Sequence, residues 1–387
     1  MRISSVYIKQ RFAPFLTKLC VAFMLLSAIV SCGNGGASPQ NIVGDSVVMR
    51  YSSLLGIVEC DGYTVVDIKN PWSDGIMHRY ILVDRECEVP PHLPMGTLLR
   101  TPLDSVLVFS TVHTRLMSDL GCADAVVGVC DSRYMEQPYI MRGISDGSIV
   151  DCGSSLNIDV EKVVQLSPQA LFVLPFENGG YGKLDKLSYP LVECAEYMET
   201  SPLGCAEWMR FYGRLFGCGQ RADSVFSSVC RNYECLRDSV AGSVEYRPTL
   251  LCELKSNSAW YVPGGGSTMG ILYRDAGAEY LFDYDKRSGS VPLSFEIVLD
   301  RAANADFWLI KYGADEDKTY SSLLDEFAGY AHFKAFREHN IYACNVSRKR
   351  FYEETPFRPD VLLRELVAVF HPQLVCDTVL RYYGKME

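Results

Sequence analysis

Side chains that could recognise a flat or charged ligand lie directly after the predicted strands of this chain. Aromatic faces suit a macrocycle or a catecholate, and cations suit carboxylates or a negatively charged ferric complex. We predict that these side chains line a wide ligand cleft, with ordinary loop packing as the alternative for each one. They are Arg133, Tyr134, Phe176, Trp260, Tyr261, Lys311, Tyr312, Phe357 and Arg358.

His113 joins this set because it follows an apolar strand predicted over residues 106–109. The carboxyl edge of a parallel sheet is where ligands usually bind. A capping or surface role is the alternative for this histidine.

The sequence contains no motif of an enzyme active site. Gly-x-Ser-x-Gly, His-Glu-x-x-His and the P-loop are all missing from it. The loop 264–268 is rich in glycine and precedes a helix, but it lacks the lysine and the spacing of a phosphate-binding loop, which favours a tight loop at the ligand cleft. The six histidines and 15 cysteines show no closely spaced ligand pair. We therefore predict no catalytic residue, no metal ligand and no cofactor.

Two acidic residues begin similar stretches of the chain. Residues 161–174 start at Glu161, and residues 296–310 start at Glu296. Each stretch has a short helical pattern, a small polar break and an apolar strand-like run. The similarity indicates two related α/β units, with chance recurrence as the alternative. An acid at the start of a helix is also favoured by the helix dipole alone.

The N-terminus has the pattern of a secretory signal. Residues 1–18 contain four basic residues and no acidic one, and Leu19 to Val30 form an apolar segment of signal-peptide length. The segment ends in Ser31-Cys32, which resembles a bacterial lipobox. This resemblance implies cleavage after a signal peptide of residues 1–31, acylation of the Cys32 thiol and attachment to a bilayer by lipid. An ordinary secretory signal with an incidental cysteine is the alternative.

The charge of the chain argues against one class of partner. Removing the cations of residues 1–31 changes the formal net charge from −10 to about −14. Nucleic-acid binding needs clustered Lys and Arg to neutralise phosphates, so we expect no nucleic-acid partner. After the signal peptide, no run of roughly 18 apolar residues follows, which predicts that no further segment spans a membrane.

The first half of the mature chain contains a β-rich segment and then an alternation of strands and helices. Residues 32–43 form a Gly/Ser/Asn/Pro-rich tether, and residues 44–96 form a small β extension with a hairpin at Asp61-Gly62. In residues 97–217, strands alternate with helices, which predicts a mostly parallel sheet.

The second half begins with a long helix and repeats the alternation. Apolar residues at a spacing of three and four predict a spine helix over residues 218–243. Residues 244–387 then form a second lobe that ends in a helix from Pro359 to Phe370. The predicted fold class is α/β, with two Rossmann-like lobes joined by a long spine helix and a small N-terminal β extension.

The order of these features resembles the substrate-binding proteins of ABC importers for iron–siderophore complexes, haem and cobalamin. The resemblance covers roughly residues 98–375. It rests on the segments Val106 to Val129, Asn157 to Leu174, Trp260 to Phe282 and Phe357 to Pro372. The β extension lies outside the family's minimal pattern.

The resemblance implies a role for the two acidic residues. In that family, one glutamate on each lobe docks onto arginines of the membrane permease, and Glu161 and Glu296 occupy the matching places. An insertion at Ile158-Asp159 makes Asp159 a rival for the first position.

The resemblance also implies the function. We expect a non-enzymatic, lipid-anchored protein on the periplasmic side of a membrane of the cell envelope. It would capture an iron chelate of the siderophore type and deliver it to an ABC permease and its ATPase, with cobalamin or haem as alternative ligands. An α/β lipoprotein hydrolase and an interaction module built on the β extension are the alternatives from other classes.

Overall fold

The computed structural model describes residues 42–375 and 378–387. The predicted signal peptide and Cys32 lie outside the described residues. Residues Gly44 to Glu387 form one compact unit. Among the described helices, none combines the length and the apolar character needed to cross a bilayer.

The β extension is a five-stranded sheet in which the strands follow one another in chain order. Its turn at Asp61-Gly62 joins two antiparallel strands through the pair Cys60 and Tyr63, which confirms the predicted hairpin. The last strand pairs in parallel with the strand before it, so Thr97–Thr101 belongs to this sheet and not to the lobe that follows. The strands are β1 (Asp45–Val47), β2 (Leu55–Cys60), β3 (Tyr63–Lys69), β4 (Ile76–Asp84) and β5 (Thr97–Thr101).

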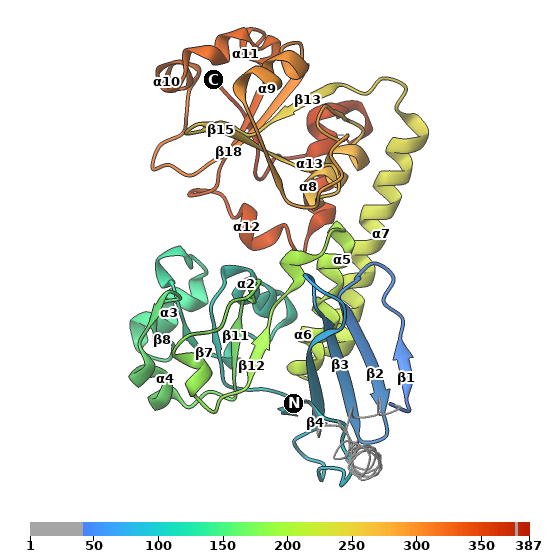
Figure 1. Ribbon diagram of the computed structural model, residues 1–387, viewed down its shortest axis with the longest axis vertical. Helices are drawn as coiled ribbons and strands as arrows, with labels where there is room; N and C mark the ends of the chain where they lie inside the picture. The colour runs from blue at the N-terminus through green and yellow to red at the C-terminus, as the bar shows by residue number, and fades with distance from the viewer. Residues whose placement is uncertain (1–41, 376–377) are drawn as a thin grey trace, which may run out of the picture. The chain divides into compact units, whose positions relative to one another are not determined.

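The N-terminal lobe is built on a parallel sheet with the strand order β12-β11-β6-β7-β8 (Figure 1). The three central strands β11, β6 and β7 are short and apolar, as expected where a sheet is buried on both faces. The strands of this sheet are β6 (Val106–Val108), β7 (Val126–Val129), β8 (Val150–Asp151), β11 (Ala170–Val173) and β12 (Leu191–Glu193). The helices of this lobe are α2 (Thr111–Leu120), α3 (Pro138–Asp146) and α4 (Val160–Leu166), and a two-stranded hairpin is made by β9 (Gly153–Ser154) and β10 (Asn157–Ile158).

The β extension meets the edge of this sheet through one tyrosine. The buried Tyr80 of β4 donates its hydroxyl to the carbonyl of Leu191 at 2.9 Å and accepts the amide of Glu193 at 2.8 Å. Both partners lie on β12, the edge strand of the lobe. A side chain thus makes the two hydrogen bonds that a neighbouring strand would make there.

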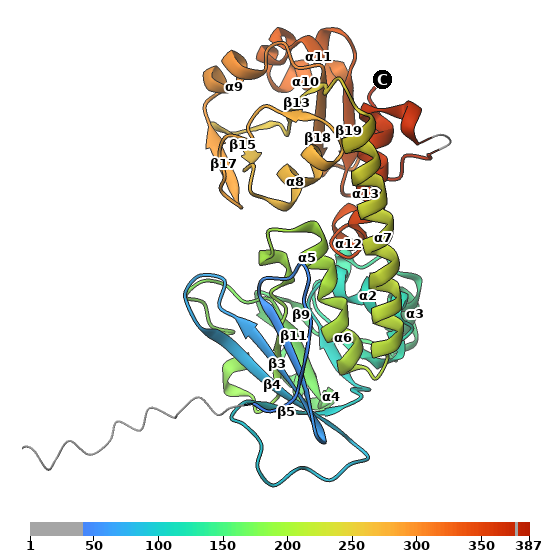
Figure 2. The ribbon, with the colours of Figure 1, turned by 90° about the vertical axis from the view of Figure 1, so that its right-hand side faces the viewer.

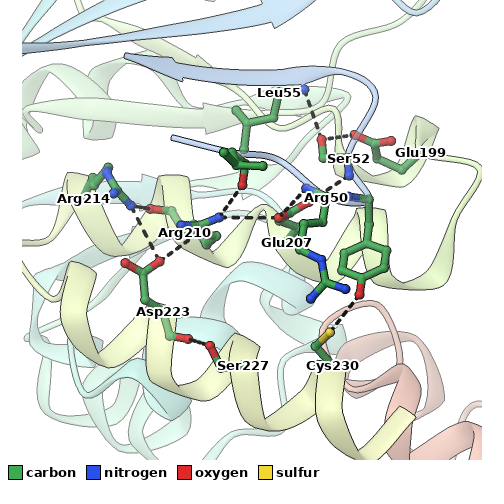
Figure 3. A network of polar contacts seen from close by, with 12 residues as sticks. Arg50, Ser52, Leu55, Glu199, Glu207, Arg210, Arg214, Asp223, Ser227 and Cys230 are labelled. Atoms are coloured by element: carbon green, nitrogen blue, oxygen red, sulfur yellow. Dashed lines mark hydrogen bonds and ion pairs between the residues drawn. The ribbon is translucent and has the colours of Figure 1, made fainter. Parts of the chain in front are cut away.

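A second attachment holds the segment between β1 and β2 (Figure 3). The fully buried carboxylate of Glu207 accepts the backbone amides of Arg50, Tyr51 and Ser52 at 2.9–3.1 Å. The buried carboxylate of Glu199 accepts the next two amides, from residues 53 and 54, at 3.0 and 3.1 Å. Two carboxylates therefore satisfy five consecutive backbone donors and fix the extension to the lobe.

Three helices follow the first lobe, namely α5 (Pro202–Glu207), α6 (Met209–Leu215) and α7 (Gly219–Ser243). The third has 25 residues and is about 37 Å long at 1.5 Å per residue (Figure 2). Its buried face includes Val229, Tyr233, Leu236 and Val240, which is the apolar stripe expected from the sequence. It packs on α6 and on α13 (Pro359–Phe370), the last long helix of the chain.

The C-terminal lobe has the strand order β16-β13-β18-β19-β20, with a three-stranded sheet β14-β15-β17 beside it. The strands are β13 (Thr249–Cys252), β14 (Lys255–Ser256), β15 (Ala259–Pro263), β16 (Glu279–Tyr280), β17 (Ser290–Leu293), β18 (Phe307–Tyr312), β19 (Ile341–Asn345) and β20 (Gly384–Lys385). The helices are α8 (Thr268–Asp275), α9 (Phe295–Ala302), α10 (Tyr320–Glu326), α11 (Lys334–Arg337), α12 (Phe351–Glu354) and α13.

The two lobes contact each other through α12 and α2. Gln137, next to α3, donates to Glu353 at 3.1 Å, and Arg115 of α2 pairs with Glu354 at 3.1 Å. Two sheet-containing lobes, the long helix and the β extension together confirm the predicted fold class.

The two similar stretches of sequence occupy corresponding places in the two sheets. Helix α4 leads into β11, which pairs in parallel with β6, the first strand of its lobe. Helix α9 leads into β18, which pairs in parallel with β13, the first strand of the other lobe. Each stretch therefore places a strand beside the first strand of its own sheet.

Candidate functional site

The strand order of the N-terminal lobe defines where a crevice should open. From β6 the chain moves to β7 and β8 on one side, and then returns to β11 and β12 on the other side. Loops that leave β6 and β11 at their carboxyl ends therefore run in opposite directions, and such a switch point is the usual ligand site of an open α/β sheet.

A cavity of about 480 Å³ lies at this switch point. Phe109 follows β6, and Val173, Leu174 and Phe176 come from the end of β11 and the loop after it. The volume falls within the roughly 300–1,000 Å³ of typical small-molecule sites.

The wall of the cavity is apolar, and its rim exposes large hydrophobic side chains. Phe176 is 65% exposed, and Leu156 of the β9–β10 hairpin is 97% exposed. Exposed apolar groups beside a cavity indicate a surface that a ligand or partner covers. Lys183 supplies a cation at the same cavity. The hydroxyl of Tyr181 donates to Glu193 at 2.9 Å, and burial raises the pKa of this tyrosine, so the hydroxyl stays neutral.

His113 does not line this cavity, although the sequence placed it near the same sheet edge. It is buried in the lobe and bonds through Nε2 to the Glu196 carboxylate at 2.7 Å. The Tyr212 hydroxyl donates to the other oxygen of Glu196 at 2.7 Å. Burial would lower the pKa of His113, but the neighbouring Cys194 and Glu196 raise it well above its ordinary value. Burial would likewise raise the pKa of Glu196, but His113 lowers it, so the two form an ion pair.

His113, Cys194 and Glu196 offer three metal-ligating atoms within 4.8 Å of one another. A nitrogen, a sulfur and an oxygen suit a borderline cation such as zinc. Here, however, Glu196 uses one oxygen for His113 and the other for Tyr212, and the Cys194 thiol donates to a backbone carbonyl at 3.4 Å. The charges of His113 and Glu196 thus compensate each other, while the buried Nδ1 of His113 has no hydrogen-bond partner among the described residues. Because its cysteine is fully buried, the same trio also lacks the access that a hydrolase nucleophile requires.

The corresponding edge of the C-terminal lobe carries a partly buried ion pair. Lys311 at the end of β18 bonds to Glu253, the residue after β13, and its ammonium lies 5.7 Å from the ring of Phe351. Burial would lower the pKa of Lys311, but Glu253 raises it well above its ordinary value, so the lysine remains charged. The predicted cleft residue Lys311 thus lies at a strand end with its charge already compensated.

The structure divides the remaining predicted cleft residues into two groups. Trp260 and Phe357 are buried in the core, and Arg358 pairs with Asp360 at 2.9 Å. The exposed or partly exposed residues are Arg133, Tyr134, Tyr261 and Tyr312. The guanidinium of Arg133 lies over the ring of Tyr134. Of the sequence-based set, Phe176 is the member that lines the N-terminal cavity.

The glycine-rich loop 264–268 packs against the chain and does not form an anion cradle. The amides of Gly264, Gly265 and Gly266 donate to the carbonyls of residues 289, 285 and 287 at 2.6–3.2 Å. A Cβ on any of the three would approach that opposing backbone within 2.1–2.4 Å. The glycines therefore serve close packing, and none of their three amides is free for a phosphate.

Glu161 and Glu296 occupy the same position on two capped helices. Each is the second residue of its helix, α4 or α9, and each side chain is exposed. The N-cap residues Asp159 and Ser294 use their side chains to accept the amides of residues 162 and 297. Asp159 is thus engaged in capping, whereas the two glutamates project from equivalent sites.

The fold and the sequence agree on one class of protein. A model of the family described as periplasmic binding protein matches residues 106–346, which is more than half of the chain. The chain belongs to the periplasmic binding protein family, whose members are solute-binding proteins.

Individual relatives were found in both sequence and structure. Two uncharacterized lipoproteins of Methanocaldococcus jannaschii are 26% and 24% identical, over 88% and 91% of this chain and 85% and 90% of theirs. A periplasmic haem-binding protein of Pseudomonas aeruginosa has a TM-score of 0.57 at 17% identity, covering 74% of this chain and 98% of that one. A possible iron-binding protein of Staphylococcus epidermidis has a TM-score of 0.55 at 16% identity, covering 70% and 99%. These structures share the fold.

Sequence reasoning missed most of the cavity. Phe109 was part of a predicted strand, and Leu156 and Tyr181 lie in loops without a recognisable pattern. A strand that ends in an aromatic residue at a topological switch point is the one signal that could have indicated Phe109.

Proposed function

We propose that this chain is the lipid-anchored solute-binding component of an ABC importer, and that its cargo is an iron chelate of the siderophore type. The observation that carries the proposal is the apolar, aromatic-rimmed cavity at the switch point of the N-terminal sheet. The family match supports a binding role, and the proposal includes no catalytic step.

The chemistry of the cavity favours a metal ion bound by an organic chelator over a bare metal ion. Its lining contains no histidine, cysteine, aspartate or glutamate, so it offers few direct ligands to a bare cation. Its one phenol, that of Tyr181, already donates to Glu193, which disfavours axial ligation of a haem iron. Phe109, Phe176 and Lys183 instead suit the aromatic rings and negative charge of a ferric chelate.

The names of similar structures keep two alternatives open. They include a haem-binding protein and a vitamin B12-binding protein from Vibrio cholerae, the latter with a TM-score of 0.50 at 14% identity. Cobalamin and haem are therefore the alternative cargoes.

Delivery would use the two exposed glutamates. Glu161 and Glu296 present carboxylates from equivalent capped helices, one on each lobe, to arginines of a permease that works with an ATPase. Acylation of Cys32, which lies outside the described residues, would hold the protein at the membrane of the cell envelope. The remaining sequence-based cleft residues that are exposed, Arg133, Tyr134, Tyr261 and Tyr312, are proposed as further ligand contacts.

Binding of a ligand panel tests the proposal. Purified full-length protein in detergent is titrated with a ferric hydroxamate, a ferric catecholate, haem and cyanocobalamin, and binding is followed by fluorescence quenching and calorimetry. We expect one ferric chelate to bind at about micromolar Kd or tighter, and the iron-free chelator to bind more weakly. Tight binding of haem or cobalamin alone would replace the proposed cargo, and no binding at micromolar concentrations by any member would refute the importer function.

A further inference from the structure

A second cavity of about 620 Å³ adjoins the cavity of about 480 Å³ at the switch point, which is called the cargo cavity below. The second cavity is called the Glu161 groove, because Glu161 lies in its wall. Three residues line both spaces, namely Asn157, Ile158 and Lys183, so they form a shared wall. The remaining residues of the Glu161 groove are Asp159, Val160, Lys186 and Leu187.

The shared wall continues directly into the helix that carries Glu161. Asn157 and Ile158 form β10, and Asp159 after them is the N-cap of α4. The strand is fixed by its pairing with β9, and the amide of Asp159 donates to the carbonyl of Cys152 at 2.9 Å. Ile158 contacts the cargo cavity and is three positions before Glu161, so the two spaces are also close along the chain.

The Glu161 groove contains as many acidic as basic side chains. Two acids, Asp159 and Glu161, and two lysines, Lys183 and Lys186, line it. Among the described residues, neither lysine forms an ion pair, and the Nζ of Lys183 donates one long hydrogen bond to the Oδ1 of Asn157 at 3.4 Å. The charge of Lys183 is therefore available to a ligand on either side of the shared wall.

Lys183 is also the natural partner for a charge on the cargo. Of the described residues that line the cargo cavity, Lys183 alone is charged. A negative charge inside an apolar cavity is costly unless it is paired, so an anionic ligand in this cavity would place its charge at Lys183. Once Lys183 is paired with the cargo, the Glu161 groove has two acids and one uncompensated lysine.

We propose that an anionic cargo strengthens docking at Glu161 by neutralising Lys183. This inference rests on the proposed function, from which it takes both the ferric chelate and the docking role of Glu161. In the empty protein the charge of Lys183 weakens the attraction of the groove for an arginine of the permease. In the loaded protein this opposing charge is compensated, so the permease prefers the loaded form. By linkage, the docked permease strengthens cargo binding by the same factor.

The second docking glutamate provides an internal control. Glu296 is exposed and occupies the equivalent position of α9, but it lies in neither of the two cavities. Its electrostatic environment should therefore not respond to cargo, and changes at Glu161 can be measured relative to it.

The test measures the reactivity of both carboxylates in full-length protein in detergent. A cationic, water-soluble carbodiimide couples exposed carboxylates to glycine ethyl ester, and mass spectrometry gives the extent of coupling at Glu161 and at Glu296. Because the reagent is a cation, its local concentration follows the negative potential at each carboxylate. Saturation with the ferric catecholate, which is an anion, should raise the coupling of Glu161 relative to Glu296 by about two- to fivefold.

Two matched variants remove the same charge from the same groove. Lys183→Met and Lys186→Met should each raise the coupling of Glu161 in the empty protein. The further rise with cargo should disappear only in Lys183→Met, measured at a cargo concentration that saturates this variant. Lys186→Met should keep the rise, because Lys186 does not line the cargo cavity.

Salt gives a test in the wild type alone, which avoids any effect of a variant on folding. The Debye length is about 30 Å at 0.01 M salt and about 3 Å at 1 M salt. With saturating cargo at both concentrations, the rise in coupling at Glu161 should be large at low salt and small at high salt. A rise of equal size at both concentrations contradicts an electrostatic coupling.

The remaining outcomes separate this inference from the proposed function. If the ferric catecholate binds and the coupling of Glu161 does not change, or if Lys183→Met keeps the full rise, only this inference is refuted. If the ferric catecholate does not bind, the inference is refuted as well. If no member of the ligand panel binds, the proposed function is refuted together with it.

Discussion

Replacing Phe176 with alanine gives the most direct measure of the proposed ligand cavity. The side chain is 65% exposed, so little of it packs against the protein. A fully buried aromatic side chain covers about 150–250 Å², which leaves roughly 130 Å² of Phe176 for a ligand to cover. At about 25 cal/mol per Å², complete coverage is worth about 3 kcal/mol and half coverage about 1.5 kcal/mol.

The expected result is a loss of affinity without a loss of stability. Phe176→Ala should raise Kd for the cargo by about 10- to 150-fold, because each 1.4 kcal/mol is a factor of ten. The free energy of unfolding should fall by less than about 2 kcal/mol, since only about a third of the side chain is buried. Kd is measured by isothermal titration calorimetry and unfolding by urea titration of the same preparation.

A matched variant separates the cavity from a general effect of losing an exposed aromatic. Tyr284 is 51% exposed and lies beside Arg301 in the C-terminal lobe. Tyr284→Ala should leave Kd within about twofold of the wild type. If Phe176→Ala also binds within about twofold, the ligand does not use this cavity and the argument from its exposed rim is wrong.

Three further predictions address the ion pair, the β extension and the docking glutamates. His113→Ala should cost about 3–5 kcal/mol in urea unfolding because Glu196 remains buried and unpaired, and a loss below about 1 kcal/mol would refute the ion pair. The pKa of Glu196 is lowered from its ordinary 4.5 and that of His113 is raised from its ordinary 6.5, so the pair stabilises fully between about pH 4.5 and 6.5. Its contribution is lost as the pH rises through the raised pKa of His113 or falls through the lowered pKa of Glu196, so Glu196→Gln should flatten this profile. Glu207→Ala should cost about 2–4 kcal/mol and speed hydrogen exchange of the amides of residues 50–52, and unchanged exchange would contradict the attachment. The double variant Glu161→Arg/Glu296→Arg should reduce import at least about tenfold while Kd for the cargo stays constant. Normal import by this variant would refute the docking assignment.

Local sequence patterns predicted the elements that carry their own signals. The helix Pro359–Phe370 has the predicted ends because proline suits a first helical turn, and the Asp61-Gly62 hairpin forms because glycine adopts a positive φ of 78° there. The similar stretches that start at Glu161 and Glu296 also predicted two corresponding helix–strand units. This was possible because the helix and the strand of each unit are adjacent in the sequence.

The candidate site depended on contacts that no local pattern records. His113 is buried together with its partner Glu196, which lies 83 residues further along the chain. No local pattern near either residue predicts this pair. Trp260 looked like a loop aromatic, yet β15 pairs with β17 and places it in the core. Thr97–Thr101 precedes a lobe in sequence but completes the sheet of the extension.

The hydroxyl of Tyr80 has a consequence for how this protein avoids self-association. An edge strand with open backbone groups is a template for pairing with another copy, and β12 is such a strand. Tyr80 occupies the free carbonyl of Leu191 and the free amide of Glu193, so the edge has no adjacent pair of groups to offer to a second molecule. The extension therefore covers the strand edge at which a second copy of the chain could otherwise pair.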